Sequence, residues 1–266
     1  MNIVFYSVAA LGLYATGTLY QLGIYYQKIQ ARSFFIYLTG FLAVLAHTAA
    51  TYGMVAGMDG PDLGFLKISS LIACLIVFIL LLMTLRHPLR NLFLIAYPLA
   101  AATLVASLIF EIPAHQLQAT GSGLLTHIIL SVLAYAIFTL AAAQAFLLYL
   151  QNRQLKTNYT SRLLRNLPPL QTMERLLFEM IWAGWILLTL SIINGMIFIE
   201  NIFAQHLVHK TLLSILAWAI FSTLLIGRQI AGWRGLTASR WTLWGCFVLM
   251  LGYYGSKLVL ELVIKH

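Results

Sequence analysis

Long uninterrupted apolar stretches are the feature that most constrains this chain. Runs of about 20 apolar residues, the length that crosses a bilayer as an α-helix, occupy nearly all of its 266 residues. They lie at about residues 3–26, 33–56, 64–85, 92–110, 123–150, 179–203, 210–230 and 241–263. Only 9% of the residues are charged, whereas a soluble domain carries about 25%. The sequence therefore excludes a soluble globule. It predicts an all-α polytopic membrane protein, a bundle of about eight transmembrane helices that forms a single domain over residues 1–266.

The basic residues are concentrated in every second connection between these runs. Twelve of the sixteen Lys and Arg residues lie in or beside the first, third, fifth and seventh connections. Under the positive-inside rule these connections are cytoplasmic, so both termini are expected outside, on the periplasmic side. The net charge of +9 is spread over these short loops rather than gathered on one stripe or arm. Membrane topology explains it better than nucleic-acid binding, which is not predicted.

Motifs for catalysis and for covalent haem attachment are missing from the sequence. Cys74 and Cys246 fall inside apolar runs and form no CxxCH motif, so any haem would be bound non-covalently. No HExxH or GxSxG motif occurs, and the acidic residues of the outer side form no paired motif. The sequence also shows no internal repeat and no glycine-rich phosphate loop. It gives no support for an enzyme.

Five of the seven histidines fall in the outer half of the predicted bundle. His47 lies just past the middle of the second run, and His127 lies one turn inside the outer end of the fifth. An ionisable residue within a membrane span is costly and usually faces a partner or a cavity. The alternative is a hydrogen bond to a neighbouring helix. We interpret His47 and His127 as candidate metal ligands, with His115 in the loop before the fifth run as a further candidate.

Two lysines extend this outer cluster. Lys67 lies one turn inside the outer end of the third run, and Lys257 lies in the outer half of the eighth. Each can place its ammonium group in water by extending its side chain. Alternatively, two cations above two imidazoles suit a flat ligand that carries carboxylates. Haem fits that description, because its iron takes histidine nitrogens as axial ligands. The hypothesis is a haem site whose propionates contact Lys67 and Lys257.

Two segments leave alternatives open. One face of the fifth run either holds a flat ring edge-on or packs against other helices; its members at helical spacing are His127, Ser131, Tyr135 and Phe138. The longest polar stretch, residues 151–178, is expected on the cytoplasmic side and contains Pro168-Pro169. Its apolar residues from Leu170 to Met180 recur at helical spacing. They form either a short interfacial helix or the lead-in to the sixth span.

The second half of the chain also carries a series of recognisable motifs. In chain order they are His115 to Phe138, Pro168-Pro169-Leu170 with Met173-Glu174-Arg175, Lys210 to Trp218, Arg228 with Gly232-Trp233-Arg234-Gly235, and Gly252 to Lys257. Together they resemble the cytochrome c assembly (CcsA/HemX-like) family of membrane haem-handling proteins, and its short YpjD branch in particular. The resemblance implies a multi-pass protein of the bacterial inner membrane that takes part in cytochrome c assembly. It also implies non-covalent haem b toward the periplasmic side, and apocytochrome c or another membrane subunit as partner.

The family pattern is incomplete in this chain. By position, the resemblance makes His127 an axial haem ligand and His47 the histidine of an early helix. The tryptophan-rich outer loop of longer members is missing, however, and Ile226 stands where they have another transmembrane histidine. Only His266 is available to replace their second external histidine. Two functions therefore stay open: haem handling, and a HemX-like membrane adaptor or regulator that no longer binds haem. A solute channel has less support, because no polar path continues through the inner half.

Overall fold

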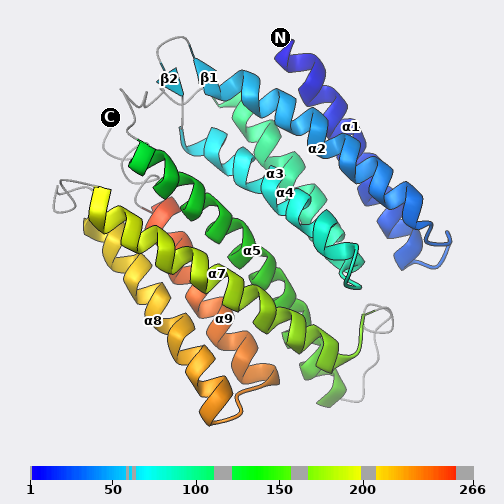
Figure 1. Ribbon diagram of the computed structural model, residues 1–266. Coiled ribbons are helices and arrows are strands. Elements are labelled where there is room, and N and C mark those ends of the chain that lie inside the picture. The colour runs from blue at the N-terminus through cyan, green and yellow to red at the C-terminus, as the bar shows by residue number, and fades with distance from the viewer. Residues whose placement is uncertain are drawn as a thin grey trace. The chain divides into compact units, whose positions relative to one another are not determined.

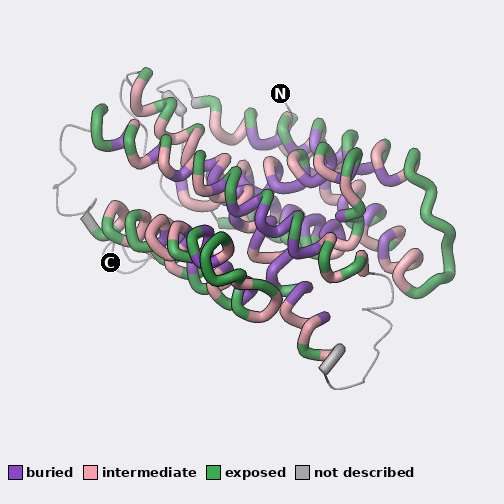
Figure 2. Tube along the Cα trace, turned by 60° about the horizontal axis from the view of Figure 1, so that its bottom comes forward, coloured by how far each residue is buried: buried purple, intermediate pink, exposed green. Residues whose placement is uncertain are grey.

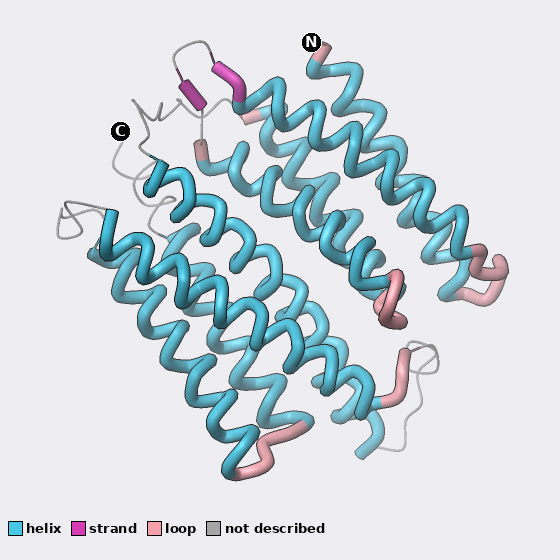
Figure 3. Tube along the Cα trace, viewed as in Figure 1, coloured by secondary structure: helices cyan, strands magenta, loops and turns pink. Residues whose placement is uncertain are grey.

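The prediction of an all-α fold is confirmed (Figures 1 and 3). The computed structural model describes residues 2–57, 60–61, 64–110, 122–156, 167–198 and 208–255. These residues contain eight α-helices: α1 (Ile3–Tyr25), α2 (Ser33–Val55), α3 (Phe65–Thr84), α4 (Phe93–Ile109), α5 (Ser122–Lys156), α7 (Leu170–Phe198), α8 (Val208–Ile230) and α9 (Gly235–Met250). A 3₁₀-helix, η1 (Arg90–Leu92), precedes α4, and a π-helix, η2 (Leu251–Gly255), follows α9. Two-residue strands β1 (Ala56–Gly57) and β2 (Gly60–Pro61) pair antiparallel between α2 and α3.

Seven of the described helices are long and apolar enough to cross a membrane. The exception is α9, which has 16 residues and continues into the five residues of η2. Three helices extend beyond their apolar runs, because α5 runs on to Lys156, α7 already begins at Leu170 and α9 begins at Gly235. An apolar run reports only the part of a helix that suits lipid. Backbone hydrogen bonding continues into polar residues beyond it.

The early start of α7 decides between the two alternatives for residues 170–180. Met173, Leu177 and Met180 are 1%, 0% and 2% exposed, and they belong to the same continuous helix as the membrane span. They are therefore the lead-in to that span and not a separate interfacial helix. A helix that continues past the lipid keeps its apolar face buried against its neighbours.

Residues Met1–Ala119 form one compact unit, called unit 1. Consecutive helices from α1 to α4 pack against each other, and α1 also packs against α4, which closes a four-helix ring. The core is aromatic. Phe93 and Tyr97 stack with ring centroids 4.9 Å apart, and the ring centroids of Tyr14 and Tyr97 are 5.6 Å apart. Gly17 permits this packing, because a Cβ there would lie 2.7 Å from the Tyr97 ring.

Residues Thr120–His266 form the second compact unit, called unit 2. Its helices follow the same plan, since α5, α7, α8 and α9 pack in chain order and α5 also packs against α9. At its centre the rings of Phe138 and Phe221 stack with centroids 4.0 Å apart. Both units thus have the same cyclic order of four helices, although the sequence showed no repeat. That the two units act as one domain stays a prediction.

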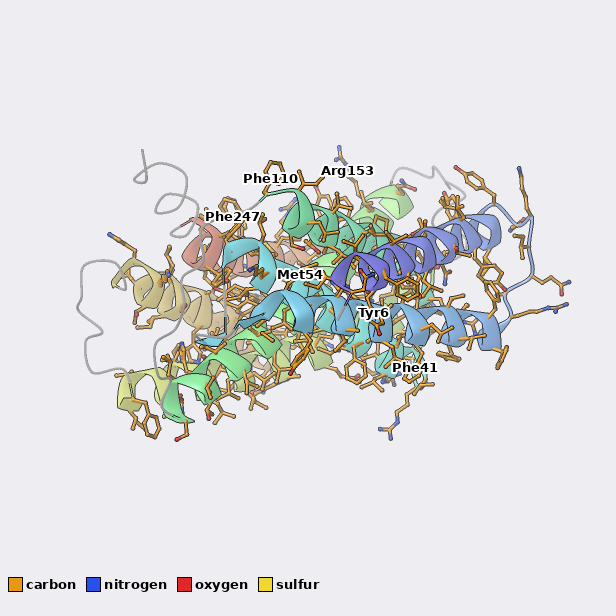
Figure 4. The ribbon with its side chains drawn as sticks, turned by 90° about the horizontal axis from the view of Figure 1, so that it is seen from above. Tyr6, Phe41, Met54, Phe110, Arg153 and Phe247 are labelled. Atoms are coloured by element: carbon orange, nitrogen blue, oxygen red, sulfur yellow. The ribbon has the colours of Figure 1, made fainter. Side chains whose placement is uncertain are left out.

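The surfaces of both units suit lipid. Buried residues lie on the inner sides of the helices, and exposed ones lie on the outer sides (Figure 2). Many exposed residues are large and apolar, among them Phe41 and Phe247, which Figure 4 labels on the outside of the helices. In water such a surface would drive aggregation. With the seven apolar helices it identifies a multi-pass membrane protein.

Candidate functional site

His127 occupies the first turns of α5, near the end of the helix that the topology predicts to be periplasmic. Its Nδ1 lies 2.9 Å from the backbone carbonyl oxygen of Ser191 on α7 and 3.4 Å from the hydroxyl of the same serine. The imidazole is half-buried. Two contacts fix this part of the antiparallel α5–α7 pair: Ser131 and Ser191 share a hydrogen bond of 2.7 Å, and Gly123 lies directly against the Phe198 ring.

The hydrogen-bond partner of Nδ1 determines which ring nitrogen of His127 carries the proton. A carbonyl oxygen can only accept, so Nδ1 carries the hydrogen and donates it to Ser191. In the neutral imidazole the lone pair then belongs to Nε2. Within the described part of the chain, Nε2 has no hydrogen-bond partner. Histidines that bind metals characteristically donate their other N–H to a carbonyl or carboxylate in this way. Among the described residues, His127 therefore keeps Nε2 without a partner, with its ring held through Nδ1.

The rest of the α5 face that follows His127 packs against other helices. Ser131 bonds to Ser191, the Tyr135 hydroxyl donates to the carbonyl of Leu249 at 2.9 Å, and Phe138 stacks on Phe221. Of the two alternatives for this face, helix packing is the one that the structure supports.

His47 lies in a different setting, in the core of unit 1. It is 0% exposed, and both ring nitrogens form hydrogen bonds: Nδ1 with the Tyr14 hydroxyl at 2.9 Å and Nε2 with the Ser70 hydroxyl at 2.8 Å. Hydroxyl groups can donate or accept, so either tautomer is satisfied. Tyr14 and Ser70 come from α1 and α3, so His47 ties three helices together. In this arrangement neither nitrogen is available to a metal.

The other predicted site residues give less information. Lys67 lies in the first turn of α3 and is half-exposed, within unit 1. His115 and Lys257 lie outside the described residues, as do His206 and His266. His209 is exposed at the start of α8. The described residues contain no group of three or more His, Cys, Asp and Glu side chains that could hold a bare metal ion. A porphyrin needs only axial ligands from the protein, so this finding bears on ions and not on haem.

Asn194 is a polar residue that the sequence reasoning missed. It lies one turn beyond Ser191 on α7, toward the same end as His127, and its buried Oδ1 has no hydrogen-bond partner among the described residues. A buried unpaired amide oxygen is costly and calls for a donor. The available signal was an asparagine in the apolar sequence Ser191-Ile192-Ile193-Asn194. Attention to ionisable groups alone passed over it.

The motifs at the other end of unit 2 build the turn between α8 and α9. Gly232 and Gly235 have positive φ values of 64° and 54°, which favour glycine. The Glu174 carboxylate accepts the backbone N–H of Gly235 at 2.6 Å. Arg228 donates to the carbonyl of Trp233 at 3.4 Å and lies over the Phe178 ring, 4.6 Å from its centroid. These residues give the Met173-Glu174-Arg175 and Gly232–Gly235 motifs a structural role.

Comparison with known proteins places these features in a family. The chain matches the family described as "Cytochrome C assembly protein" over residues 35–264. It is 31% identical to Inner membrane protein YpjD of Escherichia coli (strain K12) over 230 residues, which cover 85% of this chain and 86% of that protein. It is 32% identical to Protein HemX of Brevibacillus brevis over 138 residues, which cover 51% of each chain.

An uncharacterized 28.8 kDa protein of Azospirillum brasilense is 33% identical over 140 residues, 52% of each chain. No solved structure matches the chain. The family match spans most of the sequence and both units, and the YpjD similarity covers nearly the whole length of both proteins. Together with the seven apolar helices, these matches identify a multi-pass protein of the inner membrane. The chain belongs to the cytochrome c assembly protein family.

Proposed function

We propose that this protein binds haem b non-covalently at the outer end of unit 2 and handles it during cytochrome c assembly. Nε2 of His127 would hold its iron. The observation that carries the proposal is the hydrogen bond from Nδ1 of His127 to the Ser191 carbonyl, because it directs the lone pair to Nε2 and fixes the ring. Bound haem would supply an iron that accepts this nitrogen. It would also carry propionates, which need cations near the water boundary.

His47 has a structural role in this proposal. To bind iron it would have to give up a hydrogen bond to Tyr14 or Ser70 inside a fully buried core. Each lost bond would leave a hydroxyl unpaired, at a cost of about 1–3 kcal/mol. Of the two candidate ligands from the sequence, His47 therefore has less support than His127. That His115 is a further ligand and that Lys67 and Lys257 contact the propionates stay predictions from the sequence, which substitution of each residue would test.

The direct test is the visible absorption spectrum of the detergent-purified full-length protein, oxidised and reduced, before and after haem reconstitution. We expect a Soret band that falls by more than half in His127→Ala and recovers when imidazole is added. His47→Ala, corrected for the amount of folded protein, should keep the band. His209→Ala, an exposed histidine on α8, is the matched control and should behave as wild type. Equal spectra for all four proteins would contradict His127 as the ligand.

The main rival is a HemX-like membrane adaptor that does not bind haem. The similarity to Protein HemX and the satisfied hydrogen bonds of His47 favour it, since among the described residues both ring nitrogens of one ligand candidate are already bonded. The adaptor predicts no Soret band after reconstitution and full function of His127→Ala in cells. The haem proposal predicts that His127→Ala lowers the yield of holocytochrome c. Under the haem proposal the partner is apocytochrome c or another membrane subunit of an assembly system, whereas the adaptor would influence the amount or activity of another protein.

A further inference from the structure

A charged pocket lies at the opposite end of unit 2 from His127, away from the proposed haem ligand. It has a volume of about 480 Å³ and is open at the protein surface. Its walls come from the first turns of α7, the end of α8 and the α8–α9 turn. They are formed by Gln171, Glu174, Arg175, Phe178, Glu179, Trp182, Arg228 and Arg234. Three arginines and two glutamates in one pocket raise the question of which charges are left for a ligand.

The two acids are already engaged by the protein. Glu174 accepts the Gly235 backbone N–H at 2.6 Å. Glu179 pairs with Arg175 at 3.7 Å, one helical turn away. Arg228 donates one N–H to the Trp233 carbonyl, and a guanidinium group has five N–H donors in all. Arg234 is exposed and has no ion pair within the described segments. The pocket therefore offers two guanidinium groups to an anion. A guanidinium group is planar and donates paired hydrogen bonds, and a phosphate or a carboxylate matches this geometry best.

The surface next to the pocket is apolar, and this indicates the kind of anionic ligand that fits. Trp182 forms its edge and is 41% exposed. From Trp182 the exposed apolar residues of α7 continue along one face toward the other end of the helix, as Ile186, Leu190, Ile193 and Ile197. Their spacing of three and four places them in one stripe. A tryptophan between a charged pocket and an apolar stripe is the arrangement of the membrane–water interface.

We propose that this pocket binds one anionic phospholipid, with its phosphate between Arg228 and Arg234 and an acyl chain along the α7 stripe. A free phosphate or a soluble phosphorylated compound would satisfy the arginines but would leave the stripe unused. Clusters of basic residues at the cytoplasmic end of membrane helices are known to bind anionic headgroups. The proposal is independent of the haem site, which uses other residues at the other end of the unit.

Native mass spectrometry of the full-length protein in a non-ionic detergent tests the proposal. The delipidated protein is given equal amounts of phosphatidylglycerol and phosphatidylcholine, and the bound lipids are counted. Wild type should prefer phosphatidylglycerol, and each of Arg228→Gln and Arg234→Gln should lower that preference about fivefold, the effect of one basic residue near a headgroup. Arg240→Gln changes an exposed arginine of α9 that does not line the pocket. This control should leave the preference unchanged.

Arg234→Gln keeps the test valid if Arg228→Gln fails to fold, because Arg234 lies on the exposed rim. Equal binding of the two lipids by wild type would overturn the proposal. So would an equal loss in Arg234→Gln and Arg240→Gln, because it would mean a non-specific effect of charge. A competition arm adds inorganic phosphate to the protein bound to phosphatidylglycerol. Displacement at phosphate concentrations similar to those of the lipid would make a free phosphate the ligand and would overturn the lipid assignment.

Discussion

The carboxylate of Glu174 and the backbone N–H of Gly235 form a 2.6 Å hydrogen bond across 61 positions of the sequence. The bond joins the second turn of α7 to the first residue of α9 and satisfies one of the N–H groups that a helix leaves unpaired at its start. Glu174 is 7% exposed, so the bond is shielded from water.

Removing this carboxylate should destabilise the protein. We expect Glu174→Ala to lower the free energy of unfolding by about 1.5–3 kcal/mol, because it leaves a shielded N–H without its charged acceptor. The measurement is thermal or denaturant unfolding in detergent. Glu179→Ala, one turn and one residue further on the same helix, is the control. It breaks an exposed i,i+4 pair with Arg175, and the loss of this pair should cost about 0.3–0.5 kcal/mol. Equal losses would show that the cap contributes little.

The two membrane histidines should differ in their effect on stability. His47→Ala leaves a cavity and two unpaired hydroxyls in the core of unit 1, and we expect a loss of about 2–4 kcal/mol. Ser70→Ala breaks one hydrogen bond of the same group and leaves Nε2 of His47 unpaired, so it should cost about 1–3 kcal/mol and less than His47→Ala. His127→Ala removes a half-buried ring and should cost less than His47→Ala. The same unfolding measurement ranks all three, and the opposite order for the histidines would contradict a structural role for His47.

Helix packing in unit 2 should depend on the absence of a side chain at position 184. A Cβ on Gly184 would lie 2.9 Å from the Phe138 ring, which is itself stacked on Phe221. We expect Gly184→Leu to cost about 1–3 kcal/mol, the usual range for overpacking. Gly12→Ala is the contrasting change in α1, because a Cβ there meets nothing within 4 Å. It should be neutral or stabilising by up to about 1 kcal/mol. Thermal unfolding of both variants checks the pair of predictions.

Reporter fusions test the predicted topology, in which both termini lie on the periplasmic side. Alkaline phosphatase is active only outside the inner membrane. We expect it to be active when fused to the C-terminus and inactive when fused after residue 160. A fluorescent protein that matures only in the cytoplasm should give the reverse pattern. Activity of phosphatase after residue 160 would invert the topology, and His127 would then lie at the cytoplasmic end.

The internal hydrogen-bond partners explain why only part of the site could be predicted. The periodicity and charge of the sequence placed His47 and His127 in membrane helices, but they gave both the same rank. The difference depends on Tyr14, Ser70 and Ser191, which lie between 23 and 64 positions away. A sequence without its fold does not show which distant hydroxyl or carbonyl reaches a given ring nitrogen. For Asn194 the sequence shows only an asparagine among apolar residues, and the packed helices bury its Oδ1 without a partner among the described residues.

The sequence by itself determined that this protein is a bundle of apolar helices, because bilayer thickness fixes the length of a span and its apolar composition. It also determined the family, through motifs such as Gly232–Gly235. Only the tertiary structure decided the ring of four helices in each unit, the start of α9 at Gly235 and the hydrogen-bond partners of the two histidines. Those features arise from side chains that meet across helices, where packing and hydrogen bonding act between residues that are distant in the chain.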